Sequence, residues 1–279
     1  MKVLLLGRSG QVGWELERLL AGSTELTALD RKQCDLRHPE QVVAAVRAVR
    51  PHVIVNAAAY TAVDRAETDA HESTVVNARA PALLAAEARS LGALLVHYST
   101  DYVFDGGKRA PYVEDDPTCP MQVYGRTKLE GELAIGAAGC RHIILRTSWV
   151  YAGRGKNFML AILQRARSGA PLRVVNDQRG TPTWAHDVAA LTASLLRLKD
   201  LPQGTFHAAA AGETTWFDFA GQILKRAGIG AAIEPISTAD YGSPTPRPLY
   251  TVLDSSRLSR ETGVPAIGEW SERLAAVLS

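Results

Sequence analysis

The chain has 279 residues, of which 46% are hydrophobic and 22% charged. This composition indicates a globular protein of one large or two modest domains, and it excludes a disordered, collagen-like or coiled-coil chain. The net charge is only +2, which gives no argument for a nucleic-acid groove. The apolar runs are short, so we expect neither a membrane span nor a signal peptide.

Strands and helices alternate through roughly the first 146 residues. Apolar runs predict strands at Val3–Leu6, Glu25–Leu29, Val53–Val55, Leu94–Tyr98 and His142–Leu145. Helical spacing predicts helices at Val12–Leu20, Pro39–Val49, Asn77–Leu91 and from about Tyr124 to Ile135. Such alternation with mostly short connections predicts an α/β fold, a Rossmann-type doubly wound parallel sheet.

The pattern loosens after about Arg146. Glycine, proline and aromatic residues cluster in residues 149–158, 176–184 and 240–250. We interpret these segments as loops and short elements of a second, smaller C-terminal lobe.

A glycine-rich loop spans Gly7 to Gly13, directly after the first predicted strand, with the spacing G-x-x-G-x-x-G. In this position Gly7 permits a tight turn, and Gly10 lets a pyrophosphate reach the free N–H groups of a helix N-terminus. Gly13 allows the helix to pack closely on the strand. The motif alone is a weak signal, but its place between strand and helix predicts dinucleotide binding.

The choice of dinucleotide is ambiguous. Asp30 ends the second predicted strand, where an acid holds the adenine ribose hydroxyls of NAD. Arg31 follows at once, and Arg8 lies inside the glycine loop. Either arginine could pair with the 2′-phosphate of NADP. The two arginines favour NADPH, with NADH usable.

Tyr124 and Lys128 form a Y-x-x-x-K pair, and this spacing puts both on one helical face. A lysine ammonium beside a phenol favours the phenolate, so we expect Lys128 to lower the pKa of Tyr124. Tyr124 could then exchange a proton with a reacting oxygen. Thr100 lies near the end of the fourth predicted strand and offers that oxygen a hydroxyl. These residues predict an NAD(P)-dependent oxidoreductase.

Together these parts resemble the extended short-chain dehydrogenase/reductase family, and longer blocks resemble its dTDP-4-dehydrorhamnose reductases. The blocks are residues 57–67, 99–106, 146–151, 157–158, 177–183 and 246–248. They occur in the order of that family and, with the glycine loop, cover nearly the whole chain. The resemblance implies reduction of the 4-keto group of dTDP-4-dehydro-L-rhamnose to dTDP-L-rhamnose, the last step of that pathway.

The resemblance also implies roles for individual residues. NAD(P)H would deliver hydride, Tyr124 would protonate the developing alkoxide, Lys128 would tune Tyr124, and Thr100 would orient the carbonyl. The implied cofactor-binding residues are Gly7, Gly10, Gln11, Val12, Asp30, Arg31, Asp35, Leu36, Ala57, Ala58, Ala59, Thr61, Tyr124 and Lys128. The implied substrate-binding residues are Val63, Thr100, Asp101, Tyr102, Trp149, Asn157, Gln178 and Arg247.

On this basis we expect an NAD(P)-binding domain in residues 1–150 with roughly 183–211. Roughly 151–182 and 212–279 would form the sugar-nucleotide-binding lobe. We expect a small-molecule substrate, no nucleic-acid or membrane partner, and a homodimer as an open alternative. Some family members dimerise through a metal, for which Glu15 and Asp187 are candidates, but the sequence offers no third ligand and we predict no metal. Three scattered cysteines without a C-x-x-C spacing indicate the reducing cytoplasm.

Two other interpretations remain open. The chain could be another enzyme of the extended family, a sugar-nucleotide 4-epimerase or a different 4-ketosugar reductase. It could also be a regulatory subunit that binds the cofactor without catalysis. Such a subunit usually has a degraded Tyr/Lys pair, whereas the pair is complete here.

Overall fold

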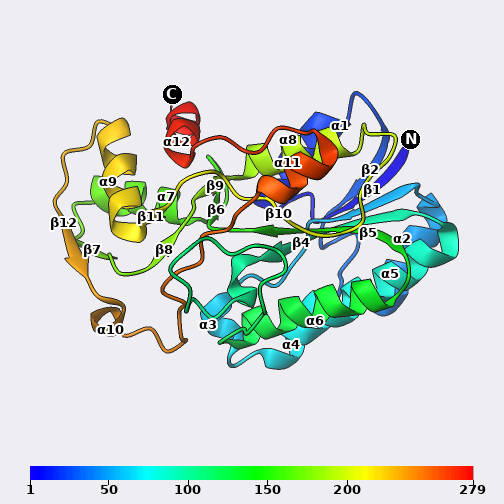
Figure 1. Cartoon of the computed structure of the whole chain (residues 1–279), viewed down its shortest axis with the longest axis horizontal. Helices are drawn as coiled ribbons and strands as arrows, with labels where there is room; N and C mark the ends of the chain where they lie inside the picture. The colour runs from blue at the N-terminus through cyan, green and yellow to red at the C-terminus, as the bar shows by residue number, and fades with distance from the viewer. Residues whose placement is uncertain (279) are drawn as a thin grey trace.

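The computed structural model describes residues 1–278, and a six-stranded parallel sheet forms its centre (Figure 1). The strands follow the order β10-β5-β4-β3-β1-β2. Their bounds are β1 (Lys2–Leu6), β2 (Glu25–Leu29), β3 (Val53–Asn56), β4 (Leu94–Thr100), β5 (Arg141–Thr147) and β10 (Gly204–His207). Because the order reverses at β1, with β2 on one side and β3 on the other, helices cover both faces. The prediction of a doubly wound sheet is confirmed.

Neighbouring residues of each strand enter different hydrophobic cores, one on each face of the sheet. Val3 and Leu5 of β1 belong to the first core, and Leu4 and Leu6 to the second. The helices α1 (Gln11–Leu20), α8 (Ala185–Leu195) and α11 (Ser256–Thr262) contribute to the first core. The helices α2 (Pro39–Val49), α5 (Ala80–Leu91) and α6 (Val123–Ala137) contribute to the second. The strands therefore carry nearly continuous apolar runs, as strands covered on both faces require.

The helix predicted at Asn77–Leu91 begins earlier and is interrupted. The chain forms α3 (Val63–Ala66), α4 (Ala70–Thr74), the π-helical segment η1 (Val75–Arg79) and then α5. Asn77 lies buried in η1, where its side chain accepts from Tyr60 N at 2.9 Å and donates to Tyr60 O at 3.0 Å. The wider π-helical turn therefore points the Asn77 side-chain amide at the loop after β3. The regular spacing of a helix in the sequence does not predict this orientation.

The remaining elements gather mainly at one end of the sheet, on the left in Figure 1. They are η2 (Asp101–Val103), β6 (Val150–Tyr151), α7 (Phe158–Arg167), β7 (Leu172–Val175), β8 (Arg179–Gly180), β9 (Thr183–Trp184), β11 (Thr214–Thr215), α9 (Trp216–Arg226), β12 (Ile233–Ile236), α10 (Thr238–Tyr241) and α12 (Trp270–Leu278). Three small two-stranded sheets, β11-β8, β12-β7 and β6-β9, organise this end. Among the segments predicted as loops and short elements, residues 149–158 and 176–184 therefore contain the short strands β6, β8 and β9.

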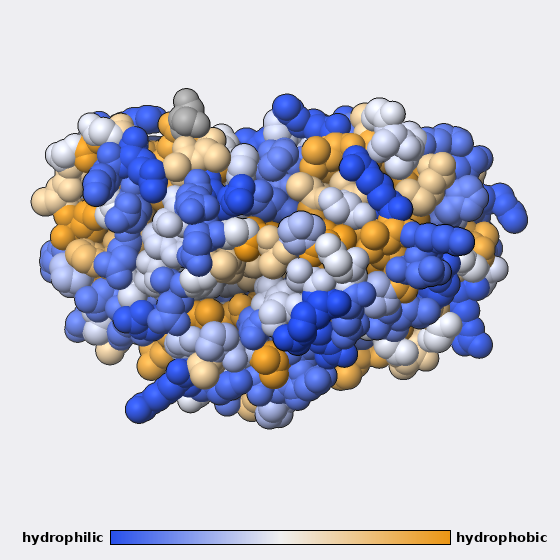
Figure 2. All heavy atoms as spheres, turned by 45° about the horizontal axis from the view of Figure 1, so that its top comes forward, coloured by the Kyte–Doolittle hydropathy of each residue, from blue (hydrophilic) through white to orange (hydrophobic). Residues whose placement is uncertain are grey.

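The surface is mixed in character. On the face shown in Figure 2, hydrophilic residues surround smaller hydrophobic areas. Among residues 1–278, we find no helix with the length and apolar character needed to cross a bilayer.

Helix α6 approaches its neighbours through glycines. A Cβ atom added at Gly125 would lie 2.2 Å from the carbonyl oxygen of Tyr102 in η2. One added at Gly131 would lie 2.2 Å from the carbonyl oxygen of Asn77 in η1. Gly136, on the same helix, faces open space. The first two glycines therefore set how closely α6 packs.

We expect Gly131→Ala to lower the free energy of unfolding by about 1–3 kcal/mol, because the added methyl group meets rigid backbone. The matched change Gly136→Ala should raise that free energy by about 0.5–1 kcal/mol, since alanine restricts the unfolded chain at no steric cost. Urea denaturation of both variants measures the difference. Equal stability of the two variants would contradict the close packing of α6 on η1.

Candidate active site

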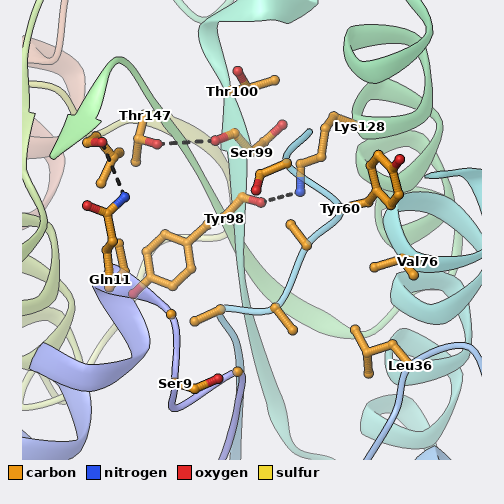
Figure 3. Close-up of a pocket in the computed structure, with 18 of the residues that line it drawn as sticks. Ser9, Gln11, Leu36, Tyr60, Val76, Tyr98, Ser99, Thr100, Lys128 and Thr147 are labelled. Carbon is orange, nitrogen blue, oxygen red and sulfur yellow. Dashed lines mark hydrogen bonds between the residues drawn. The ribbon is translucent and has the colours of Figure 1, made fainter. Parts of the chain in front are cut away.

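A cleft of about 650 Å³ opens at the carboxyl ends of the central strands (Figure 3). Its lining comes from the glycine loop, the segments after β2 and β3, the end of β4, the start of α6 and residues 147–157. Ligands of open α/β sheets bind at this edge, where the strand order reverses. The volume lies within the usual range for small-molecule sites.

The glycine loop can adopt its conformation because its glycines carry no side chain. Gly7 has φ +85°, and a Cβ added there would lie 2.7 Å from Ala58 N. A Cβ added at Gly13 would lie 2.1 Å from the carbonyl oxygen of Gly7. Gly10 is the N-cap of α1, where no side chain caps the helix and no acid lies in the first turn. The N–H groups at this helix start can therefore bind an anion.

Most of the predicted site residues line this one cleft. They are Gly7, Gly10, Gln11, Val12, Arg31, Asp35, Leu36, Ala57, Ala58, Ala59, Thr61, Thr100, Asp101, Tyr124, Lys128, Trp149 and Asn157. Gln11 joins the two sides of the cleft, because it bonds to Val150 O at 3.4 Å and to Asn157 at 2.9 Å. The sheet thus brings together residues that are up to 150 positions apart in the sequence.

Asp30, Val63, Tyr102, Gln178 and Arg247 lie outside the residues that line this cleft. Asp30 faces an adjacent shallow hollow that it shares with Arg8. Its carboxylate accepts from the backbone N–H groups of Lys32 and Gln33, at 2.8 and 3.2 Å. The side chain therefore caps the turn after β2 in this structure.

Gln178 does not point into the cleft. It is buried, and its amide donates to Thr238 at 3.0 Å and accepts from the indole of Trp216 at 3.2 Å. Trp216 in turn stacks on Trp149, with ring centroids 3.5 Å apart. Gln178 thus supports the Trp149 wall from behind, whereas we had expected it to contact a ligand. Trp149 also has φ +45°, which is uncommon for a residue with a side chain.

Arg247 and Tyr102 form a cluster beside the cleft with a third residue that the sequence did not indicate. The Arg247 guanidinium donates to Asp64 at 2.6 Å and lies 5.9 Å from the ring centre of Tyr102. Val63 precedes Asp64 at the start of α3. The contact joins α3 to the segment after α10.

Arg31 enters the cleft as part of a charge network. It donates to Asp35 at 3.3 Å and to Glu72 of α4 at 3.2 Å. Arg37 completes the network through Asp35 at 2.6 Å, and the Arg37 bonds are the largest influence that lowers the pKa of Asp35. An anion that approached Arg31 would therefore compete with two carboxylates.

The relation between Lys128 and Tyr124 differs from the sequence-based expectation. The Lys128 ammonium donates to the carbonyl oxygen of Tyr98 at 2.6 Å (Figure 3). It also lies 3.1 Å from His97 Nε2. Burial raises the pKa of Tyr124, and only a hydrogen bond with Thr100 acts in the other direction. The expectation that Lys128 lowers the pKa of Tyr124 is therefore wrong for this structure, because the ammonium is turned toward β4.

Thr100 connects the tyrosine to a buried acid. Its hydroxyl donates to Asp101 at 3.1 Å, and Ser148 donates to the other carboxylate oxygen at 3.2 Å. Burial nevertheless raises the pKa of Asp101 to about 6. The reacting end of the cleft thus holds a phenol, a hydroxyl and a weak acid within one hydrogen-bonded chain.

Sequence reasoning missed several lining residues. They are Ser9, Cys34, Tyr60, Glu72, Val76, Tyr98, Ser99, Thr147, Val150, Gly155 and Lys156. Tyr98 and Ser99 directly precede Thr100 on β4, so the strand-end argument could have included them. Glu72 reaches the cleft from a separate helix, and no local pattern marks it.

Glu15 and Asp187, the two candidates for a metal, have other partners. Glu15 lies 3.1 Å from His186, and Asp187 lies 3.7 Å from Arg273. Within the part of the chain that the structure describes, no group of three or more acidic, histidine or cysteine side chains is arranged to hold a metal ion.

Comparison with known proteins gives consistent matches over the whole chain. Residues 1–279 match the family model described as RmlD substrate binding domain. The chain is 44% identical to the dTDP-4-dehydrorhamnose reductase of Burkholderia thailandensis, over 95% of this chain and 94% of that protein. It is 40% identical to the enzyme of the same name from Escherichia coli K12, over 100% and 97%. The structure of dTDP-4-dehydrorhamnose reductase from Bacillus anthracis in complex with NADP aligns with a TM-score of 0.94 and 32% identity, covering 99% of this chain and 98% of that one.

Proposed function

The chain belongs to the RmlD substrate binding domain family, and we propose that it reduces dTDP-4-dehydro-L-rhamnose to dTDP-L-rhamnose with NADPH. This reaction is the last step of dTDP-rhamnose biosynthesis, and the protein is an NAD(P)H-dependent oxidoreductase. The observation that carries the proposal is the placement of Tyr124, Thr100 and Lys128 together at one end of the cleft. The glycine loop forms part of the same cleft.

The residues present fit a dinucleotide. The uncapped start of α1 offers N–H groups to a pyrophosphate, and Ala57, Ala58 and Ala59 leave room above the end of β3. Arg31 offers a guanidinium to a 2′-phosphate. Reduced nicotinamide, when bound, supplies the hydride. We infer that NADPH is preferred and that NADH can serve.

The chain's own groups then manage the proton and the orientation of the substrate. On substrate binding the Thr100 hydroxyl turns from Asp101 to the carbonyl oxygen, donates to it and aligns it with Tyr124. Tyr124 gives its phenolic proton to the alkoxide that forms at C4, and its raised pKa keeps that proton in place until then. Trp149, which lines the cleft and is stacked on Trp216, offers a flat face to the sugar nucleotide.

We further propose how the chain is divided between these tasks. Residues 1–150 with roughly 183–211 hold the cofactor, and roughly 151–182 with 212–279 hold the sugar nucleotide. Arg247, held at Asp64, is the cation that meets the diphosphate. We also propose a cytoplasmic location, supported by three free cysteines, Cys34, Cys119 and Cys140. A homodimer is proposed from the family resemblance and would be measured by sedimentation.

We expect Tyr124→Phe to lower kcat by about 100-fold or more, because the phenolic proton is lost while the ring remains. NADPH binding, followed by quenching of tryptophan fluorescence, should change by less than threefold. The assay is the loss of reduced-nicotinamide absorbance on addition of dTDP-4-dehydrorhamnose. Turnover at the wild-type rate would show that another group protonates the product.

We expect Arg31→Ala to raise KM for NADPH by about 10-fold or more, because a charge-assisted hydrogen bond to the 2′-phosphate is lost. KM for NADH should change little. Arg37→Ala is the matched control, since Arg37 belongs to the same charge network but does not line the cleft. If Arg31→Ala raises both KM values equally, Arg31 does not contact the 2′-phosphate.

A further inference from the structure

Lys128 ends a row of three buried polar side chains, and the proposed mechanism uses neither of the two residues behind it. The row runs from Asn56 at the end of β3 through His97 on β4 to Lys128 on α6. Asn56 Nδ2 lies 3.1 Å from His97 Nδ1, and Lys128 Nζ lies 3.1 Å from His97 Nε2. All three side chains are at most 2% exposed. Each polar hydrogen of these side chains therefore needs an acceptor in the row or in the backbone around it.

The backbone fixes which end of the Asn56 amide faces His97. The N–H of Ala58 donates to Asn56 Oδ1 at 3.2 Å. If the amide were reversed, its NH₂ group would meet this N–H, and two donors would face each other. Asn56 therefore presents its NH₂ group to His97, so His97 Nδ1 must accept.

This constraint determines where the imidazole proton lies. Burial holds the pKa of His97 well below its ordinary value, so the ring is neutral and carries one N–H. Since Nδ1 accepts from Asn56, the hydrogen must be on Nε2. That hydrogen points at Lys128 Nζ, whose own hydrogen-bond acceptor is the carbonyl oxygen of Tyr98 at 2.6 Å.

A charged ammonium has three N–H groups and no lone pair, so it cannot accept from His97. A neutral amine satisfies both contacts, because it donates to Tyr98 O and accepts from His97 Nε2. The row is thus complementary to Lys128 after it has lost a proton. Burial acts in the same direction and lowers the pKa of Lys128 to about 8.

We propose that His97 is a positioning residue that acts through Lys128 and prepares it to release a proton to Tyr124. When Tyr124 has protonated the substrate alkoxide, it is a phenolate. To deliver the proton, the Lys128 ammonium turns from Tyr98 O toward Tyr124 in the cleft that both residues line. An N–H bond of Lys128 then breaks, its electron pair stays on Nζ, and a new O–H bond forms on Tyr124. The neutral amine that results is the species to which His97 donates. Lys128 then regains a proton from water before the next turnover.

Other charged groups around Lys128 are balanced or act on its neighbours. Glu132, one turn further along α6, favours the ammonium form. That carboxylate is paired with Arg146 of β5 at 2.6 Å. Asp101 at the end of β4 acts on Tyr124, whose pKa it raises. The donor from His97 is therefore the contact that favours the neutral amine.

The tautomer of His97 can be measured in the free protein. Long-range ¹⁵N–¹H spectra of histidine-labelled protein distinguish Nε2–H from Nδ1–H, and His97→Gln identifies the signal among the seven histidines. We expect the neutral Nε2–H form across pH 6–9. A neutral Nδ1–H form or a charged ring would overturn the inference. This measurement involves no turnover, so its result does not depend on the proposed function.

The effect of His97 on catalysis rests on the proposed function. It can be measured in the pH profile of kcat/KM. The rate should fall as pH rises through the pKa of Lys128, near 8, because the proton is needed for reduction. Asn56→Asp makes both of its oxygens acceptors, moves the histidine hydrogen to Nδ1 and turns Nε2 into an acceptor for the ammonium. The fall of kcat/KM at high pH, the basic limb of the profile, should then move upward by about one pH unit.

His97→Gln is the conservative control. A glutamine amide can accept from Asn56 and donate to Lys128, so the basic limb should stay near pH 8, with kcat within about threefold of wild type. Thermal melting of both variants checks that they are folded. An unchanged limb in Asn56→Asp, or an equal shift in His97→Gln, would contradict the role of His97.

Discussion

Helix α6 packs closely on η2 and η1 because two of its residues, Gly125 and Gly131, carry no side chain where the backbone oxygens of those segments approach. That contact brings Tyr124 beside Thr100 and lets Lys128 reach the carbonyl oxygen of Tyr98. Any larger residue at either glycine would move the phenol and the amine away from the strand end together. The close packing of α6 on η1 and η2 therefore sets the geometry of this end of the cleft, and the electrostatics of the site depend on that geometry.

Burial has opposite consequences for the groups at this end of the cleft. It raises the pKa of Tyr124 and of Asp101, and it lowers the pKa of Lys128 and His97. In each case the neutral form is favoured, because charge is poorly solvated there. Asp101 and Lys128, with pKa values of about 6 and about 8, nevertheless stay mostly charged at pH 7, whereas Tyr124 and His97 are neutral.

Much of the Rossmann-type sheet and its helices could be predicted from the sequence, because the patterns that indicate these elements are local. The bounds of β2 and α2 agree with the prediction, and β1, β3 and β5 differ by one or two residues at an end. Helix α8 and strand β10 carried no such signal: α8 is apolar on most sides, and β10 has four residues.

The site residues were predicted to the same limited extent. Motifs identified Thr100, Tyr124 and Lys128, whereas the burial of Gln178 behind Trp216 and the direction of Lys128 depend on tertiary packing that no spacing records.

The path of the chain through the sheet has a consequence for how this molecule could be divided. After β5 the chain leaves to build β6, α7, β7 and β8, returns with α8 and β10 to extend the sheet beside β5, and then leaves again. A fragment that ended near residue 150 would expose the backbone edge of β5 and the apolar residues Ile143 and Leu145 that α8 helps to cover. Recombination that replaced everything after β5 as one continuous segment would therefore also remove β10, the outer strand of the sheet.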